Sequence, residues 1–169
     1  MILILYAQPY DISATGFYFE TAEQFMVKIT NAKNDYGETV EEFEIQFIDG
    51  ELLDAEFAKA FEVNQVNLER FFELVDEWEE HEKIRFIIAV GECGYSFDIE
   101  NDDIDQLEVD IYEENSLKDL AIRFVEKGLY GEIPERLQYY IDYDAIARDL
   151  DFDHAQITIA GNRLIYQCG

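Results

Sequence analysis

The sequence predicts an α+β protein built from three small modules. Strands are indicated where apolar and polar residues alternate, and amphipathic helices where apolar residues recur three and four positions apart. Both patterns occur along the chain, and they change near residues 62 and 106. We therefore expect an N-terminal α+β module over residues 1–62, an acidic helical module over 63–106 and a C-terminal α+β module over 107–169. The 169 residues are too few for an α/β barrel.

The first module begins with two β-rich runs, Ile2–Tyr6 and Phe17–Glu20. Helical spacing of apolar residues follows over Ala22–Asn31. Phe and Ile then alternate with Glu and Gln over Glu42–Ile48, which predicts a strand with one buried face. Helical spacing returns over Leu53–Phe61. This order of elements predicts a small α+β unit.

The middle module carries the clearest helical pattern of the chain, over about Asn67–Glu80. Its apolar stripe consists of Leu68, Phe71, Phe72 and Val75. The opposite face holds five carboxylates and has no basic residue at the i+4 positions, where one would reduce their repulsion. The run Ile84–Val90 is ambiguous between a buried strand and a buried helix.

The third module opens with Glu108–Tyr112, where Val and Ile alternate with acidic residues as in a strand. Ser116–Asp119 forms a capping box for a helix that Gly128 ends. A second helix has Pro134 in its first turn, a position that suits a residue without a backbone N–H.

A short last helix opens at Asp142 or Tyr143, and a hairpin follows it. The hairpin strands are expected over Gln156–Ala160 and Arg163–Gln167, joined by the two residues Gly161-Asn162. The third module is therefore also α+β.

Acidic residues greatly outnumber basic ones, with 39 Asp and Glu against 12 Lys and Arg and a net charge of −27. The three modules carry net charges of −10, −10 and −7, so no acidic tail accounts for the excess. Direct phosphate binding is excluded as the main activity, because few cations are present to displace counterions. With 49% apolar residues the chain can bury a core, so the acids belong to a folded surface. A basic partner is favoured, while solubility or halophilic adaptation is the alternative.

The two cysteines, Cys93 and Cys168, are 75 residues apart and form neither a CxxC pair nor a disulfide framework. We expect free thiols, with Cys93 buried, in a reducing compartment. The run from Met1 to Tyr6 lacks the basic start and the length of a signal peptide, and no segment has the roughly 20 apolar residues of a membrane helix. These features predict a soluble, cytoplasmic protein that does not bind membranes.

No catalytic residue, cofactor or metal is predicted. His81 and His154 lie far apart in the sequence and are expected on the surface. The chain lacks GxSxG, phosphate-loop and HExxH motifs. An Asp-x-Asp-x-Asp run from Asp149 begins like a calcium loop, but His154 and Ala160 stand where that loop needs Gly and Glu. An enzyme that uses a carboxylate pair is kept as an alternative, since such pairs are abundant here.

The charge pattern itself suggests a function. B-DNA presents one charge per roughly 1.7 Å of axis, so 27 charges along one path would match about 46 Å of duplex. A rigid fold with carboxylates at phosphate-like spacing would enter the basic groove of a DNA-binding enzyme and block it without chemistry. The candidate contacts are the acids of the middle module: Glu69, Glu73, Asp76, Glu77, Glu80, Asp98, Glu100, Asp102, Asp103 and Asp105.

The C-terminal module contains a run of residues that resembles a known family. The run consists of Gly131-Glu132-Ile133-Pro134, Leu137, Tyr140-Ile141-Asp142-Tyr143, Ala145 and Arg148-Asp149-Leu150-Asp151. This combination of a proline, an aromatic pair and an RDL triplet is similar to the C-terminal signature of the ArdA antirestriction proteins. The β-rich first module and the acidic helix with Trp78 are similar to that family in order and size. Ala147 departs from the pattern, because many members have Gly there.

The resemblance implies an elongated homodimer, joined through the C-terminal module, that mimics bent duplex DNA and inhibits type I restriction–modification enzymes. It implies that the middle module is a helical bundle, with Ile84–Val90 in a helix. It also implies a gene carried on conjugative elements or phages, and therefore a protein of the bacterial cytoplasm. Tyr139, Tyr140 and Tyr143 are then expected in the core or the dimer interface. The alternative is an acidic module that binds another basic DNA-binding protein or a nuclease.

Overall fold

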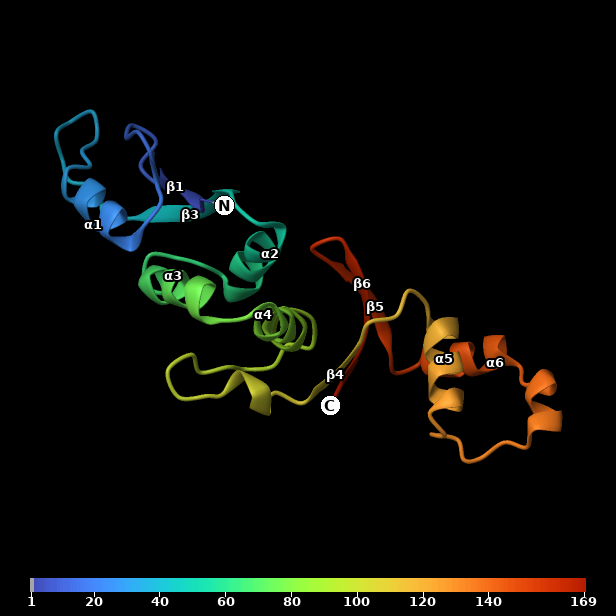
Figure 1. Ribbon diagram of the computed structural model, residues 1–169. Coiled ribbons are helices and arrows are strands. Elements are labelled where there is room, and N and C mark those ends of the chain that lie inside the picture. The colour runs from blue at the N-terminus through green and yellow to red at the C-terminus, as the bar shows by residue number, and fades with distance from the viewer. Residues whose placement is uncertain (1) are drawn as a thin grey trace. The chain divides into compact units, whose positions relative to one another are not determined.

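The computed structural model describes residues 2–169 (Figure 1). Its helices and antiparallel sheets make the protein α+β, as the sequence predicts. The chain divides into two compact units, residues 1–87 and residues 88–169. The predicted module limits near residues 62 and 106 fall inside these units and stay a prediction.

The first unit contains a three-stranded antiparallel sheet in the order β2-β1-β3. Its strands are β1 (Ile4–Pro9), β2 (Phe17–Phe19) and β3 (Phe43–Asp49). Leu5 and Ala7 of the central strand are fully buried, because alternate residues of a strand point to the same face. The sheet thus has one face in the core of the unit.

Four helices complete the first unit: α1 (Ala22–Thr30), α2 (Leu52–Phe61), α3 (Leu68–Glu77) and α4 (Glu80–Phe86). Thr21 begins α1, because its Oγ1 accepts a hydrogen bond from the Gln24 N–H at 3.1 Å. The helix α2 contacts β3, α3 and α4. This central helix therefore joins the sheet to the two helices that follow it.

Aromatic side chains form much of the core of this unit. The Phe57 ring on α2 is fully buried, and its centroid lies 5.3–5.6 Å from those of Phe61, Phe71, Trp78 and Phe86. The four pairs include stacked, tilted and edge-on arrangements, and such ring pairs are favourable beyond the area they bury. The α3 and α4 helices are therefore held against α2 by one ring cluster.

The predicted helix over 67–80 is wrong in its extent, because it ends at Glu77. Trp78 has extended backbone angles, φ −83° and ψ 136°, and separates α3 from α4. Glu79 and Glu82 then form a capping box that begins α4, so Glu80 lies on the second helix. A π-helix, η1 (Ile87–Glu92), follows α4, and the helical prediction for Ile84–Val90 is confirmed.

The second unit contains an antiparallel sheet in the order β4-β6-β5, with strands β4 (Val109–Tyr112), β5 (Ala155–Ile159) and β6 (Asn162–Cys168). Figure 1 shows α5 (Leu117–Glu126) and α6 (Tyr143–Leu150), which contact each other. The core cluster consists of Leu120, Ala121, Phe124, Leu150 and Ile165. Tyr143 packs against this cluster, which agrees with the core position predicted for it as one of two alternatives.

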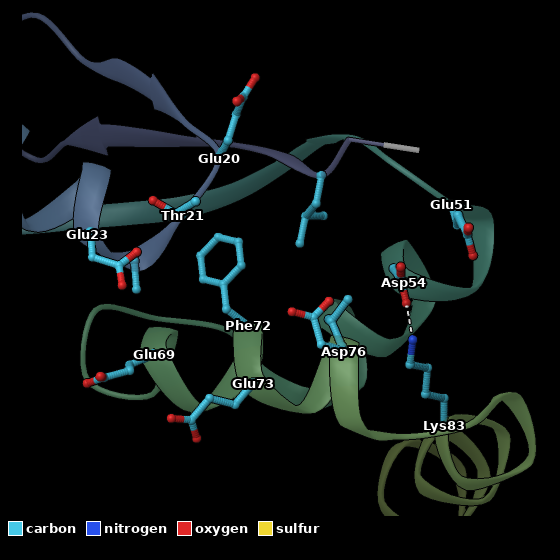
Figure 2. A pocket seen from close by; sticks show the side chains of 13 residues that line it. Glu20, Thr21, Glu23, Glu51, Asp54, Glu69, Phe72, Glu73, Asp76 and Lys83 are labelled. Carbon is cyan, nitrogen blue, oxygen red and sulfur yellow. Dashed lines mark hydrogen bonds and ion pairs between the residues drawn. The ribbon is translucent and has the colours of Figure 1, made fainter.

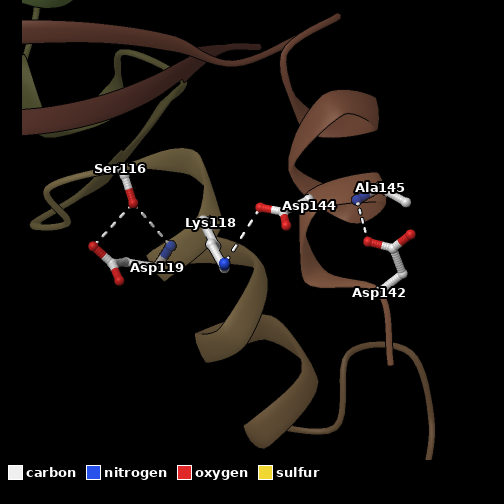
Figure 3. A network of polar contacts seen from close by, with 6 residues as sticks. All are labelled: Ser116, Lys118, Asp119, Asp142, Asp144 and Ala145. Atoms are coloured by element: carbon white, nitrogen blue, oxygen red, sulfur yellow. Dashed lines mark hydrogen bonds and ion pairs between the residues drawn. The ribbon is translucent and has the colours of Figure 1, made fainter. Parts of the chain in front are cut away.

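Side-chain caps begin both helices of this unit (Figure 3). Ser116 Oγ accepts a hydrogen bond from the Asp119 N–H at 3.1 Å, and Asp142 Oδ1 accepts one from the Ala145 N–H at 3.0 Å. An ion pair of 3.4 Å between Lys118 and Asp144 links the first turns of α5 and α6. Ser116 therefore begins α5 as an N-cap, the part of the predicted capping box that the structure shows, and its Oγ also donates to Asp119 Oδ2 at 2.9 Å.

Two local predictions for this unit are corrected. The helix expected after Pro134 is a 3₁₀-helix, η3 (Glu135–Tyr140), and Pro134 precedes it with ψ 138° instead of lying in its first turn. In the hairpin, Ile159 pairs with Asn162, so the turn is Ala160-Gly161 and not Gly161-Asn162. Both turn residues have positive φ, which suits a two-residue hairpin turn.

The expectation of free thiols is wrong. Cys93 and Cys168 form a disulfide with an S–S distance of 2.01 Å, and Cys168 is exposed while Cys93 is half-buried. His154 is also misplaced as a surface residue, since it exposes only 8% of its area. Over residues 2–169, none of the helices has the length and apolar character that crossing a membrane requires.

Candidate functional site

The acidic residues predicted on the middle helix lie at the surface of the first unit. Glu69, Glu73, Asp76 and Glu77 are all exposed on α3, and Glu80 is exposed at the start of α4. The helix buries Leu68, Phe71 and Leu74 on its other side, and a helix turned in this way must present the intervening acids to solvent.

Three of these acids line a cavity of about 550 Å³ in the first unit (Figure 2). Glu69, Glu73 and Asp76 line it from α3, and Glu23 lines it from α1. The carboxylates that line the cavity are Glu20, Glu23, Glu51, Asp54, Glu69, Glu73 and Asp76. Glu20, Glu23 and Glu51 were not predicted, because their spacing in the sequence carries no signal that they meet α3.

One cation stands among the lining carboxylates. Lys83 on α4 donates a hydrogen bond to Asp54 on α2 at 2.8 Å, and both residues are 7% exposed. A buried charge is tolerated when an opposite charge and a hydrogen bond accompany it. Lys83 and Asp54 offset each other's charge. The net negative charge of the cavity lining therefore comes from the exposed carboxylates.

Arg70 offsets part of the acidity of α3. Its Nη1 lies 2.9 Å from Glu73 Oε2 and 3.5 Å from Glu77 Oε2. Sequence inspection at i+4 spacing missed this residue, which precedes Glu73 by three positions and Glu77 by seven. Arg70 holds two carboxylates on one side of the helix and reduces their mutual repulsion.

The other predicted acids lie in a loop of the second unit. Asp98, Glu100, Asp102, Asp103 and Asp105 are exposed. Asp98 accepts hydrogen bonds from the Glu100 N–H at 3.0 Å and from Asn101 Nδ2 at 2.7 Å. The hydrogen bond from Asn101, and then that from the Glu100 N–H, hold the pKa of Asp98 below its ordinary value of 3.8.

The same loop is ordered by further hydrogen bonds to its own acids. Asp102 Oδ2 accepts from the Asp98 N–H at 2.7 Å, and the Asp102 N–H donates to the Asp98 carbonyl oxygen at 2.8 Å. Asp103 Oδ1 accepts from the Asp105 N–H at 3.0 Å and begins the 3₁₀-helix η2 (Ile104–Gln106). These carboxylates therefore fix the backbone that presents them.

The ten predicted acids thus form two groups, which we call the α3–α4 acids (Glu69, Glu73, Asp76, Glu77 and Glu80) and the loop acids (Asp98, Glu100, Asp102, Asp103 and Asp105). The first group belongs to residues 1–87 and the second to residues 88–169. Two consecutive helices carry the first group, and a hydrogen-bonded loop carries the second.

A family model described as antirestriction protein (ArdA) matches residues 13–162. The chain belongs to the ArdA family of antirestriction proteins. No curated protein matches the chain. The ArdA match includes both groups of acids and Cys93, and it ends before Cys168. Membership of this family makes antirestriction the function class of the chain.

Proposed function

We propose that this ArdA protein mimics the shape and charge of duplex DNA and competitively inhibits type I restriction–modification enzymes. The observation that carries the proposal is the exposure of all ten acids of the α3–α4 and loop groups on ordered backbone. A DNA-binding groove of the enzyme takes up these carboxylates in place of phosphates and releases the same counterions. The protein acts in the bacterial cytoplasm, encoded on a mobile genetic element, and performs no reaction of its own.

Order in the acidic surface is central to this proposal. A flexible polyanion loses conformational freedom on binding, whereas carboxylates held on a helix or in a hydrogen-bonded loop have lost it already. The α3–α4 acids satisfy this condition through the ring cluster around Phe57, and the loop acids through hydrogen bonds at Asp98 and Asp102.

The test is a restriction assay with a purified type I enzyme, titrated with the protein at two salt concentrations. Competitive mimicry predicts that added substrate DNA relieves inhibition and that raising the salt concentration weakens it steeply. Inhibition that is independent of DNA concentration would contradict the proposal. Equal binding of the protein to unrelated basic proteins and nucleases would favour a general acidic binding module instead.

We further propose that the protein is a homodimer joined through the second unit. The supporting observation is a group of large apolar side chains that are exposed between residues 129 and 152. These are Leu129, Tyr130, Leu137, Tyr139, Tyr140 and Phe152, with exposed fractions between 48% and 91%. The segment η3 buries none of its residues. A second copy of the chain covers this surface, which would otherwise leave large apolar side chains in water.

Sedimentation equilibrium tests the dimer. Tyr139→Glu and Tyr140→Glu should each shift the population toward monomer, because they place a charge in the interface. Tyr36→Glu is the matched control, since Tyr36 is 83% exposed, as is Tyr140, but lies in the first unit. A monomeric unmodified protein, or a dimer unaffected by both C-terminal substitutions, would overturn this assignment.

A further inference from the structure

The Cys93–Cys168 disulfide lies at the base of the loop that carries the second group of acids. Cys93 follows η1, and Cys168 is the last residue of β6. The intervening acidic loop, residues 94–108, leaves this disulfide and returns to the same end of β6, where Val109 pairs with Cys168. Both ends of the acidic loop are therefore fastened to one place on the sheet.

Two hydrogen bonds add to this attachment. Tyr95 Oη donates to the Gly169 carbonyl oxygen at 2.8 Å, and the Gly169 N–H donates to the Glu108 carbonyl oxygen at 3.0 Å. The second end of the loop is also held by strand pairing and by Ile104, which is 4% exposed. The first end is held to η1 by backbone hydrogen bonds of 2.9 Å from the Cys93 and Tyr95 N–H groups to the carbonyl oxygens of Ile88 and Ala89, and the disulfide is its covalent link to β6.

The two cysteines of the disulfide differ in exposure. Cys168 is an exposed residue and Cys93 is half-buried, so Cys168 is the side from which a small thiol in solvent approaches. We propose that Cys93–Cys168 is a thiol–disulfide exchange site for small thiols of the glutathione class, and that its state sets the rigidity of residues 94–103. The effect on inhibition rests on the proposed function, because these residues include four of the five loop acids, among them the N-cap Asp103.

The exchange proceeds in two balanced steps. A thiolate of the small thiol attacks Sγ of Cys168, forms a mixed disulfide with it and releases Cys93 as the thiolate leaving group, which takes up a proton from water. A second small thiolate then attacks the sulfur of the bound small thiol, releases Cys168 as a thiolate and forms the disulfide of the small thiol. The protein disulfide gains two electrons, and two small thiols lose them.

The first part of the test needs no restriction enzyme. The full-length oxidised protein is incubated with reduced glutathione under native conditions, and mass spectrometry follows the adducts. The expected products are a mixed disulfide at Cys168 and then two free thiols. A disulfide that resists glutathione in the folded protein but reacts in urea would overturn the exchange site.

Hydrogen exchange then measures the rigidity of the loop in the oxidised and the dithiothreitol-reduced protein. Amides of residues 94–103 should exchange at least about tenfold faster after reduction, a change well within the contribution of a typical disulfide. Amides of β1 and α5 should keep their rates and show that the fold persists. Equal rates in residues 94–103 before and after reduction would overturn the proposal.

Two variants separate the disulfide from its neighbours. The double variant Cys93→Ser/Cys168→Ser should exchange like the reduced protein whether or not thiol is present. Tyr95→Phe removes only the hydrogen bond to Gly169 and should loosen the loop less than reduction does; an equal effect would show that the disulfide is not the determinant and would overturn the proposal.

Inhibition assays complete the test. The oxidised protein should inhibit the type I enzyme several-fold more strongly than the reduced protein, because a looser loop loses more conformational freedom on binding. Equal inhibition by both forms, alongside different exchange rates, would overturn the regulatory role. Failure of both forms to inhibit would contradict the proposed function, while the glutathione reaction would still decide the exchange site and hydrogen exchange its effect on the loop.

Discussion

Lys83 Nζ donates to Asp54 Oδ1 across 2.8 Å, and each of the two residues exposes only 7% of its area. This ion pair joins α4 to α2 beside a cavity that six exposed carboxylates also line. The pair allows a strongly acidic surface to sit directly above the core of the first unit, because the innermost carboxylate is neutralised.

Removal of Lys83 should therefore be costly. Lys83→Met leaves the Asp54 carboxylate buried without its partner, and we expect a loss of about 3–5 kcal/mol in the free energy of unfolding. Asp54→Asn should cost less, since its amide oxygen can still accept from Lys83. Urea denaturation measures the free energy of unfolding of both variants. The control is Lys59→Met on the exposed side of α2, whose free energy of unfolding should lie within about 0.5 kcal/mol of that of the unmodified protein. A stability loss in the control equal to that of Lys83→Met would contradict this account.

The α3 carboxylates should contribute to inhibition in small, cumulative steps. Glu69→Gln, Glu73→Gln, Asp76→Asn and Glu77→Gln should each weaken binding by about 0.2–1 kcal/mol, as expected for exposed ion pairs. The losses should add for well-separated positions. Half-inhibitory concentrations in the restriction assay measure this series.

A matched control separates position from net charge. The control is a triple variant in which three exposed acids around the start of β3 are neutralised, namely Glu41, Glu42 and Glu44. It changes the net charge by the same amount as the triple variant of Glu69, Glu73 and Glu77. We expect a smaller loss from the β3 set. One substitution that abolished inhibition in a folded protein of unchanged oligomeric state would argue against distributed charge mimicry.

Phe57 should be a main determinant of stability in the first unit. Phe57→Ala removes a fully buried ring that packs against four other aromatic side chains, and the expected loss is about 3–5 kcal/mol. Trp78 is the single tryptophan and lies 5.5 Å from Phe57, so its fluorescence reports on this cluster directly. Tyr36→Ala, at a ring of the first unit that is 83% exposed, serves as the control and should leave the unfolding transition monitored by Trp78 fluorescence unchanged.

The hairpin turn offers a stabilising substitution. Ala160 has φ 50° and Gly161 has φ 83°, and a side chain with a Cβ adopts such angles at a cost. Ala160→Asn should stabilise the protein by about 0.5–1 kcal/mol, because Asn tolerates this conformation and Asn-Gly suits the turn. Gly161→Ala should destabilise it by about 1–2 kcal/mol through backbone strain alone, since no atom within 4 Å would meet the added Cβ. Thermal denaturation measures both, and stabilisation by Gly161→Ala would refute the turn assignment.

The order of the acidic loop should depend on pH through Asp98. Its pKa is lowered from 3.8 by hydrogen bonds to the ionised form, so this stabilisation is fully present above pH 3.8 and is lost as the pH falls through the lower pKa of the folded protein. NMR titration of the Asp98 carboxyl carbon should give a midpoint below 3.8. Asn101→Ala should move that midpoint upward, because the strongest contribution to the shift is removed; an unchanged midpoint would refute this cause.

Periodicity located most elements of the fold. The helix expected over Ala22–Asn31 is α1 (Ala22–Thr30), and the strand expected over Glu42–Ile48 is β3 (Phe43–Asp49). These predictions succeed because burial of one face imposes a period on the sequence of a strand or helix. The break at Trp78 was not predictable in the same way, because the acidic and apolar pattern continues through it. Packing of Trp78 against Phe57 and the capping box at Glu79 end the helix there.

The candidate site was predictable only in part. Sequence pattern identified the exposed acids of α3, since they lie opposite an apolar stripe, but it did not indicate that Phe72 and Val75 of that stripe also line the acidic cavity. It could not bring Glu20, Glu23 or Glu51 to that cavity, because their approach to α3 depends on contacts distant in sequence. The roles of Arg70 and Lys83 also depend on which turn of which helix each side chain reaches.

The sequence by itself determined the α+β class, the strongly negative surface and the family, because composition, periodicity and a local run of residues are properties of the chain alone. Tertiary structure decided which acids share a cavity, which charge is buried beside Lys83 and that Cys93 bonds to Cys168. These outcomes require residues 29 to 75 positions apart to meet, and such encounters are set by packing of the whole unit instead of by any local pattern.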